Sequence, residues 1–179
     1  MFTAGPVGAG KSELTATLLD RYDLASLDSD EITAVLASLR PARPFWASRP
    51  LALRLLDRWQ EVLISRGVPL LVNTTAADLG FVQTLRDRLV THDYRCAMIF
   101  VVADAHECSA RNAARPHPRP VDAIARTLAA CAVNRPALER LFPDFHAVAN
   151  RGGIGVFHDR IRREIWPWLD RLPAPRGPR

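Results

Sequence analysis

A glycine-rich motif near the start of the chain constrains the fold more than any other feature. Residues 5–12 read Gly-Pro-Val-Gly-Ala-Gly-Lys-Ser, the complete pattern G-x-x-x-x-G-K-[S/T]. Such a segment forms a loop between a buried parallel strand and the N-terminus of a helix, where backbone N–H groups surround nucleotide phosphates. The motif therefore predicts an α/β protein with a phosphate-binding loop.

The lysine of this motif is unusual for the composition of the chain. Lys11 is the only lysine, and every other Lys or Arg position is an arginine. An ammonium is a compact point charge that reaches the β and γ oxygens of ATP, whereas the planar fork of arginine does not fit the same cradle. The predicted ATP-binding residues in the loop are Gly5, Gly8, Ala9, Gly10, Lys11 and Ser12. We also expect a catalytic role for Lys11 and a Mg²⁺ ligand in the Ser12 hydroxyl.

Composition indicates an ordinary globular chain. With 179 residues, 48% of them hydrophobic, we expect one domain over residues 1–172 and a disordered tail at 173–179. The sequence shows neither a signal peptide nor an apolar run of membrane-spanning length, which predicts a cytoplasmic protein without a membrane partner. The three cysteines are widely spaced, which favours reduced thiols. The net charge is +5, but the arginines are scattered, so a nucleic-acid partner is disfavoured.

Apolar runs alternate with amphipathic stretches along the rest of the chain. The predicted strands are 2–4, 24–27, 68–72, 96–102 and 145–149. The predicted helices are 11–20, 31–39, 51–66, 79–90, 107–114, 121–133, 136–141 and 159–172. This alternation predicts a three-layer P-loop kinase fold, with a five-stranded, mostly parallel sheet and helices on both faces. Only four residues precede Gly5, so we expect a truncated first strand at the centre of the sheet.

Two predicted helices carry a clear apolar pattern. Leu14, Leu18 and Leu19 form the expected inward face of the first helix. In the segment 51–66, apolar side chains recur at helical spacing and predict an amphipathic helix: Leu51, Leu55, Leu56, Trp59 and Leu63.

Polar side chains follow the predicted strands at the edge where parallel sheets bind ligands. Asp28 and Asp30 follow the second strand, and Asn73 with Thr75 follows the third. A phosphoryl transferase needs a carboxylate that orients the acceptor hydroxyl and takes its proton. We expect Asp30 to be this base and its neighbour to cap the next helix. Asp28, Asn73 and Thr75 are the predicted substrate-binding residues.

The segment 115–120 reads Arg-Pro-His-Pro-Arg-Pro and predicts a mobile connection. Arginines lie in and around it, namely Arg111, Arg115, Arg119 and Arg126. Because cations stabilise the transferred phosphoryl group and arrive on a closing segment, we expect a lid over about residues 105–125.

With these residues in place, the chain resembles the zeta-toxin family of P-loop kinases, within the adenylate-kinase-like group. The resemblance runs from Gly5 to about Phe157. It rests on the order of the phosphate loop, Asp28-x-Asp30, Asn73 to Thr75, His92-Asp93-Tyr94, Ser109-Ala110-Arg111, Arg126, Phe142-Pro143-Asp144-Phe145 and Asn150-Arg151-Gly152.

The resemblance implies an ATP- and Mg²⁺-dependent kinase that phosphorylates a sugar hydroxyl of UDP-N-acetylglucosamine or a related nucleotide sugar. It implies that Asp30 is the base and that Arg115 and Arg126 are the catalytic lid arginines. It also implies that Asn150 and Arg151 lie near the adenine.

One departure from the family leaves other functions open. The family usually has Glu-Gly-Thr where this chain has Asn73-Thr74-Thr75, so an amide replaces a carboxylate. One alternative is a nucleotide-binding module without turnover, for example a degenerate toxin that binds ATP or an antitoxin protein. The others are a kinase for another small molecule, such as an antibiotic, and a nucleic-acid-end kinase.

Overall fold

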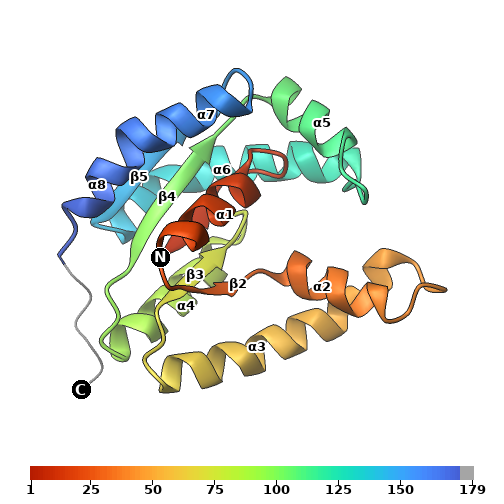
Figure 1. Ribbon diagram of the computed structural model, residues 1–179, viewed down its shortest axis with the longest axis horizontal. Coiled ribbons are helices and arrows are strands. Elements are labelled where there is room, and N and C mark those ends of the chain that lie inside the picture. The colour runs from red at the N-terminus through yellow and green to blue at the C-terminus, as the bar shows by residue number, and fades with distance from the viewer. Residues whose placement is uncertain (174–179) are drawn as a thin grey trace.

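The computed structural model describes residues 1–173, and its centre is a five-stranded sheet (Figure 1). The order of the strands is β2-β3-β1-β4-β5, and every neighbouring pair is parallel. The strands are β1 (Phe2–Ala4), β2 (Ala25–Leu27), β3 (Leu70–Asn73), β4 (Ala97–Val102) and β5 (Asp144–Ala149). The strand that leads into the glycine loop is therefore central, as predicted, and the sheet is entirely parallel.

Helices connect all the strands. They are α1 (Lys11–Arg21), α2 (Ser29–Ser38), η1 (Phe45–Ser48), α3 (Arg49–Ser65), α4 (Leu79–Thr91), α5 (Ala105–Ala113), α6 (Val121–Leu141), α7 (Ile154–Arg160), η2 (Ile161–Ile165) and α8 (Trp166–Asp170). Figure 1 shows α2 and α3 lying side by side and projecting from the sheet. We call α2, η1 and α3 together the α2–α3 arm. It faces the connection between α5 and α6.

Alternating strand residues supply the two layers of the core. In β4, Met98 and Phe100 point to one face of the sheet, whereas Ile99 and Val101 point to the other. Residues of α3, α4 and the C-terminal half of α6 cover the first face. Residues of α1, α5, α7, η2 and α8 cover the second face, together with the start of α6. The chain therefore has the three layers that its pattern predicts.

The short first strand is held on both sides. Phe2, Thr3 and Ala4 are fully buried, and they pair with β3 on one side and with β4 on the other. Met1 continues the pairing, because its carbonyl accepts from Val72 N at 2.9 Å. The aromatic ring of Phe2 also packs edge-on against that of Phe142, with 5.0 Å between centroids. Three residues are thus sufficient to anchor the loop that follows.

The break expected near Pro136 is wrong. One helix, α6, runs from Val121 to Leu141 with Pro136 in its interior. Cys131 and Leu138 lie seven residues apart on one buried face of this helix. Asn134 fixes the same region, since its amide donates to the carbonyls of Ala76 and Ala77, each at 3.0 Å. Burial and these contacts offset the backbone hydrogen bond that a proline cannot donate.

The apolar pattern of α3 only partly corresponds to a buried face. Leu63 is buried, but Leu55 is 44% exposed and Trp59 is 50% exposed. The helix packs mainly against α2 and η1, and only its C-terminal end, with Leu63 and Ile64, packs against the sheet. Because most of α3 lies beyond the sheet, it has no second layer to cover its whole apolar face.

The C-terminal helical segment has the predicted buried side, but it begins at Ile154 instead of Asp159. Ile161, Ile165 and Leu169 are buried on one side, while η2 forms a π-helical turn just before Pro167. A π turn accommodates the missing N–H of a proline in a continuing helix. The predicted disordered tail, 173–179, lies outside the described residues apart from Pro173. Within residues 1–173, no helix has both the length and the apolar character needed to cross a membrane.

A matched pair of leucine substitutions tests this packing. Leu18→Ala removes a fully buried side chain and is expected to lower the free energy of unfolding by about 2–5 kcal/mol. Leu55→Ala removes a half-exposed side chain and is expected to cost less than about 1 kcal/mol. Urea unfolding followed by circular dichroism measures both. Equal losses would contradict the exposed position of Leu55.

Candidate active site

The glycine loop connects β1 to α1 and lies between two other segments. A Cβ atom at Gly8 would lie 2.2 Å from the carbonyl oxygen of Cys108 in α5. A Cβ atom at Gly10 would lie 2.1 Å from the side-chain nitrogen of Asn150, just after β5. Both glycines also have positive φ angles, 80° and 98°. Only glycine satisfies these two positions, so the packing of the loop against Cys108 and Asn150 by itself requires both glycines.

Side chains from α5, α6 and the end of β5 hold the loop backbone. The buried Asn150 donates to the carbonyl of Ala9 at 2.8 Å. Arg111 in turn donates to the backbone and side-chain oxygens of Asn150, at 3.1 and 3.3 Å. From the other side, the Thr127 hydroxyl accepts from Val7 N at 3.2 Å. These contacts fix the shape of the loop before any nucleotide binds.

The position of Asn150 refines what the sequence suggested. Its side chain lies against the loop backbone, so its first role in the structure is to hold the loop. A contact of Asn150 with the nucleotide stays a prediction, as does one of the exposed Arg151.

The side chain of Lys11 is buried within the glycine loop. Its Nζ donates to the carbonyls of Gly5 at 2.8 Å and Pro6 at 2.9 Å. The pKa of Lys11 is lowered to about 8, mainly by burial and to a lesser degree by the nearby Arg115 guanidinium, whereas the charge of Asp28 acts in the opposite direction. The ammonium is thus kept at the loop by neutral carbonyls, where phosphate oxygens would be stronger partners.

The first turn of α1 provides a further fit to phosphate. No side chain of the described residues caps it, and its N-cap is Gly10. Its N–H groups therefore remain available for an anion. Ser12 is exposed in the same turn, as a Mg²⁺ ligand needs to be. Residues 1–173 hold no cluster of three or more His, Cys, Asp and Glu side chains that would bind a metal. A Mg²⁺ at Ser12 would complete its coordination with phosphate oxygens and water.

A chain of polar contacts links the ends of β1, β2 and β3. Asp28 caps α2 by accepting from Asp30 N at 2.7 Å. Its other carboxylate oxygen accepts from the Asn73 amide. The amide oxygen of Asn73 accepts from the Thr3 hydroxyl at 3.4 Å, and Thr3 also contacts Thr15 of α1 at 3.3 Å. The structure therefore brings the predicted residues Asp28 and Asn73 together beside the glycine loop.

Thr75 is engaged differently. Its hydroxyl accepts from Ala77 N at 3.4 Å, and its carbonyl accepts from the Cys131 thiol at 2.9 Å. Both contacts stabilise the turn that leads to α4. A substrate contact of Thr75 stays a prediction.

Asp30 lies in the first turn of α2 and lines a cavity of about 530 Å³. Two guanidinium groups donate to the same carboxylate oxygen, Oδ1: Arg49 at 2.8 Å and Arg119 at 2.6 Å. Within residues 1–173, the second oxygen, Oδ2, has no hydrogen-bond partner. One oxygen of Asp30 is thus fixed, and the other is available to a ligand.

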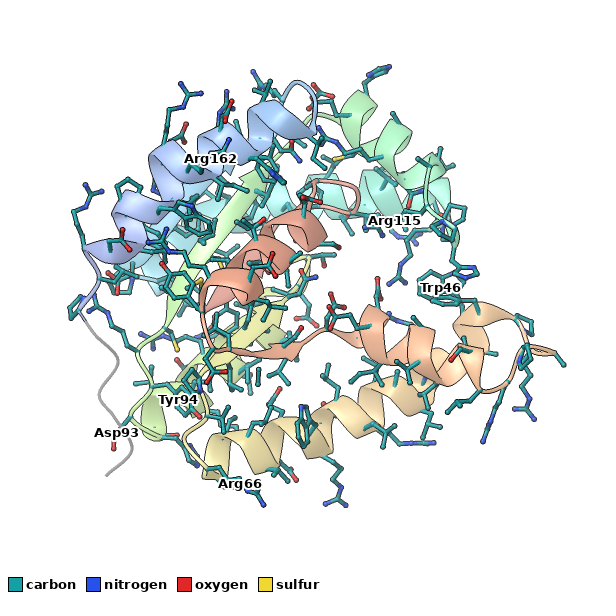
Figure 2. All side chains as sticks on the ribbon, in the orientation of Figure 1. Trp46, Arg66, Asp93, Tyr94, Arg115 and Arg162 are labelled. Carbon is teal, nitrogen blue, oxygen red and sulfur yellow. The ribbon has the colours of Figure 1, made fainter. Side chains whose placement is uncertain are left out.

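The other walls of this cavity come from the α2–α3 arm and from the loop 114–120. Figure 2 shows Arg115 and Trp46 on facing sides of it. The His117 ring stacks on that of Phe45, with 3.9 Å between centroids. The guanidinium carbon of Arg119 lies 3.9 Å from the centre of the Trp46 ring. The loop and the arm therefore close over Asp30.

Arg126 is not brought to this cavity. It lies on an exposed face of α6 and pairs with Asp122 one turn earlier in the helix. The adjacent residue, Thr127, is the one that contacts the glycine loop. Contact of Arg126 with ATP stays a prediction that needs movement of α6 or of the side chain.

Sequence reasoning missed several residues of the site, namely Arg49, Trp46, Asn112 and Thr127. Arg49 and Trp46 belong to a stretch that reads as a break between two helices. Their aromatic and basic character, in a segment without its own core, is the one signal that could have identified them. Asn112 and Thr127 contact backbone atoms, which a sequence pattern does not reveal.

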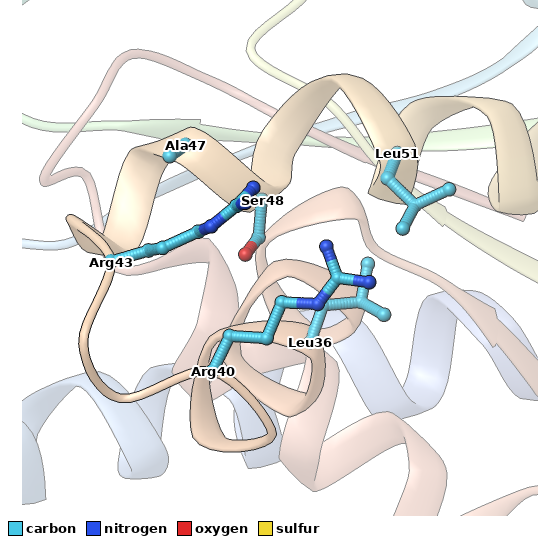
Figure 3. Close-up of a pocket in the computed structure, with 6 residues that line it drawn as sticks. All are labelled: Leu36, Arg40, Arg43, Ala47, Ser48 and Leu51. Atoms are coloured by element: carbon cyan, nitrogen blue, oxygen red, sulfur yellow. The ribbon is translucent and has the colours of Figure 1, made fainter.

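A second cavity near the site is too small for a substrate. It lies between α2, η1 and the start of α3 and has a volume of about 40 Å³ (Figure 3). Arg40 and Arg43 line it together with Leu36, Ala47, Ser48 and Leu51. Its volume suits water, whose share of the liquid is about 30 Å³ per molecule. The larger cavity beside Asp30 is therefore the candidate acceptor site.

A family comparison agrees with this geometry. The family model described as AAA domain matches residues 1–137. The chain belongs to the AAA domain family of P-loop NTPases. The matched range contains the glycine loop, Asp30, and the loop 114–120 of this AAA domain protein.

Comparison with solved structures confirms the fold. The shikimate kinase from Acinetobacter baumannii, in complex with shikimate, superposes with a TM-score of 0.54 and 16% sequence identity. The match covers 97% of this chain and 94% of that chain. At this identity the likeness shows the fold alone, and it confirms the predicted α/β P-loop kinase fold. No curated protein matches the chain. The narrower resemblance to zeta toxins stays a prediction.

The pKa of Lys11 predicts how nucleotide affinity depends on pH. Below pH 8 the ammonium is present in both the free and the bound protein, so we expect constant affinity. Above pH 8 the free protein loses this proton, and binding must restore it because phosphate raises the pKa. The affinity should then fall by about tenfold per pH unit. Calorimetric titration of ATP between pH 7 and 9.5 measures it, with Lys11→Met as the variant without this titration. Constant wild-type affinity up to pH 9.5 would contradict the assignment.

Two glycine substitutions test the fit of the loop. Gly8→Ala places a methyl group against the carbonyl of Cys108 at a positive φ angle, which costs about 2–4 kcal/mol in strain and displacement. We expect a lower melting temperature and an ATP affinity reduced by at least about tenfold. Gly155→Ala is the control, since its Cβ would meet nothing within 4 Å. It is expected to leave ATP binding unchanged. Similar effects of both substitutions would refute the packing argument.

Proposed function

We propose that the protein is an ATP- and Mg²⁺-dependent kinase that phosphorylates a hydroxyl of a small molecule bound beside Asp30. The observation that carries the proposal is the state of this carboxylate. One oxygen is held by Arg49 and Arg119, and the other is free at the wall of a cavity of about 530 Å³. Arg115, which lines the same cavity, acts electrostatically on Lys11 of the phosphate-binding loop. A carboxylate in this state and setting suits an acceptor hydroxyl.

In the proposed mechanism, Asp30 orients the acceptor and receives its proton. The hydroxyl donates a hydrogen bond to Oδ2, and its proton passes to this oxygen as the oxygen–phosphorus bond forms. Arg49 and Arg119 keep the carboxylate from rotating. The ADP leaving group carries away the electron pair of the broken bond to the γ-phosphorus.

The glycine loop handles the phosphates in this proposal. Lys11 and the N–H groups at the start of α1 stabilise the negative charge that develops during transfer. Ser12 would hold Mg²⁺, which would supply further charge neutralisation. Asp28 and Asn73 hold the strand ends together on the acceptor side, and Arg115 contributes a cation from the loop 114–120, which we propose as the lid.

For the acceptor we propose a nucleotide sugar such as UDP-N-acetylglucosamine. The cavity volume is within the usual range of small-molecule sites. Arg43 and Arg115 line it and would suit the diphosphate, while Phe45 and Trp46 offer aromatic faces to a base or sugar. The order of motifs shared with zeta toxins supports the same acceptor. By that resemblance, an antitoxin protein would be the partner.

A second candidate is a nucleotide-binding protein without turnover. Asn73 favours it, because an amide that donates to Asp28 stands where the zeta-toxin family has a carboxylate. An amide preserves hydrogen bonding but carries no charge for the acceptor or the metal. The two candidates share the phosphate loop and differ in the role of Asp30.

Turnover of Asp30 and Lys11 variants separates the candidates. Asp30→Asn keeps an oxygen that accepts hydrogen bonds from Arg49 and Arg119 but removes the base. We therefore expect kcat to fall by about 10²- to 10⁴-fold with unchanged ATP affinity. Lys11→Ala should lose ATP binding itself. ADP release with UDP-N-acetylglucosamine and a panel of small hydroxyl compounds measures kcat, and calorimetry measures ATP binding.

The matched control is Asp159→Asn, at an exposed ion pair on α7. Its kcat should equal that of the wild type. If Asp30→Asn turned over as fast as the control, Asp30 would not be the base. ATP binding by the wild type without turnover of any acceptor would favour the second candidate.

A further inference from the structure

We propose that Arg119 is a positioning residue that couples closure of the lid to the orientation of Asp30. The Trp46 ring holds the Arg119 guanidinium in place. This inference rests on the proposed kinase function. The lid here is the loop 114–120, and we use the term lid latch for the contacts of Arg119 and His117 with Asp30, Trp46 and Phe45.

The lid is a preorganised loop because the Asn112 side chain ties its C-terminal end to α5. The Asn112 amide donates to the carbonyl of Arg119 at 2.9 Å, and its oxygen accepts from Arg119 N at 3.0 Å. Asn112 is 3% exposed, so water competes little for these bonds. Three prolines stiffen the segment further, since each fixes its own φ angle. Arg119 is therefore presented by a stiff loop.

The guanidinium of Arg119 reaches across the cavity to the arm. It lies over the Trp46 ring at 3.9 Å and donates to Asp30 Oδ1 at 2.6 Å. The Arg119 side chain is only 20% exposed, less than that of Asp30. Cation–π contact and ion pairing both strengthen when the cation is partly desolvated. Beside it, the His117 ring stacks on Phe45 and extends the contact.

The two arginines that hold Asp30 come from different parts of the protein. Arg49 begins α3, which packs against α2, so it moves together with Asp30. Arg119 belongs to the lid and reaches Asp30 only when the lid is closed. Closure thus adds the second donor to Oδ1 and sets the plane of the carboxylate, with Oδ2 directed to the acceptor. It also places Arg115 within electrostatic range of Lys11.

This arrangement makes the oriented base a property of the closed state. With the lid open, Asp30 retains one arginine and its carboxylate can rotate. Water that enters the open site then meets a poorly aligned base, which limits transfer of the phosphoryl group to water. Arg119 acts through Asp30 in this scheme and does not itself touch the acceptor.

Two measurements on Arg119→Ala test the proposal. The first is amide hydrogen exchange by mass spectrometry over 45–48 and 113–119, without ligand. We expect faster exchange in both segments and no change in the sheet. The second is steady-state kinetics, in which we expect kcat to fall by about 10- to 100-fold. ATP affinity should stay within about twofold, because the glycine loop is intact.

Companion variants separate positioning from simple stabilisation. Arg119→Lys keeps the charge but loses the planar fork and should recover only part of kcat. Trp46→Leu removes the aromatic ring that the Arg119 guanidinium contacts, and it should reproduce the faster hydrogen exchange of Arg119→Ala. Arg162→Ala removes the η2 arginine that pairs with Asp159 of α7 at the surface, and it is the control without effect.

The outcomes separate the latch from the kinase assignment. Unchanged exchange in Arg119→Ala would overturn the latch. Faster exchange with unchanged kcat would overturn the positioning role. If the wild type phosphorylated no acceptor, the kinase proposal and the positioning role that rests on it would both fail, while the exchange result would still decide whether Arg119 holds the lid to the arm.

Discussion

The site depends on a glycine loop that is held from several sides by backbone contacts. Gly8 lies against the carbonyl of Cys108, and Gly10 lies against the amide of Asn150, at distances that leave no room for a Cβ atom. Since α5, α6 and the end of β5 all touch the loop, its shape depends on the packing of the second face of the sheet. This rigid setting lowers the pKa of Lys11 and leaves the first turn of α1 uncapped. A site built in this way meets phosphate with little rearrangement.

The acceptor side of the site is formed by segments outside the sheet. Asp30 belongs to the α2–α3 arm, which lies beyond the sheet and buries few side chains of its own. Its cavity is completed by contacts of the 114–120 loop with Phe45 and Trp46. Such contacts are fewer and more exposed than those of the core, so this half of the site can open at lower cost. The protein therefore combines a rigid phosphate side with an acceptor side that can move.

The predictability of each part follows from the physical origin of its signal. The phosphate loop, the five strands and the capping by Asp28 come from local chemistry, and the sequence identifies them. Pro136 misled because the burial of Cys131 and Leu138 is a tertiary effect. The spacing of Trp59 correctly predicts a helix, but the periodicity of a helix does not say whether another layer covers its apolar face. Thr127 contacts a backbone atom 120 residues away, and no pattern in one sequence encodes such a contact.

The state of Asp30 shows why local signals alone do not define a base. Its position after β2 marks it as a candidate, but a carboxylate in a first helical turn is just as suited to interact with backbone N–H groups. Asp28 performs that capping role, which leaves the Asp30 side chain free for the cavity. Arg49 and Arg119 then occupy one oxygen from opposite sides of the site. What distinguishes Asp30 as the candidate base is thus the difference between its two carboxylate oxygens. This difference arises where the arm and the 114–120 loop meet.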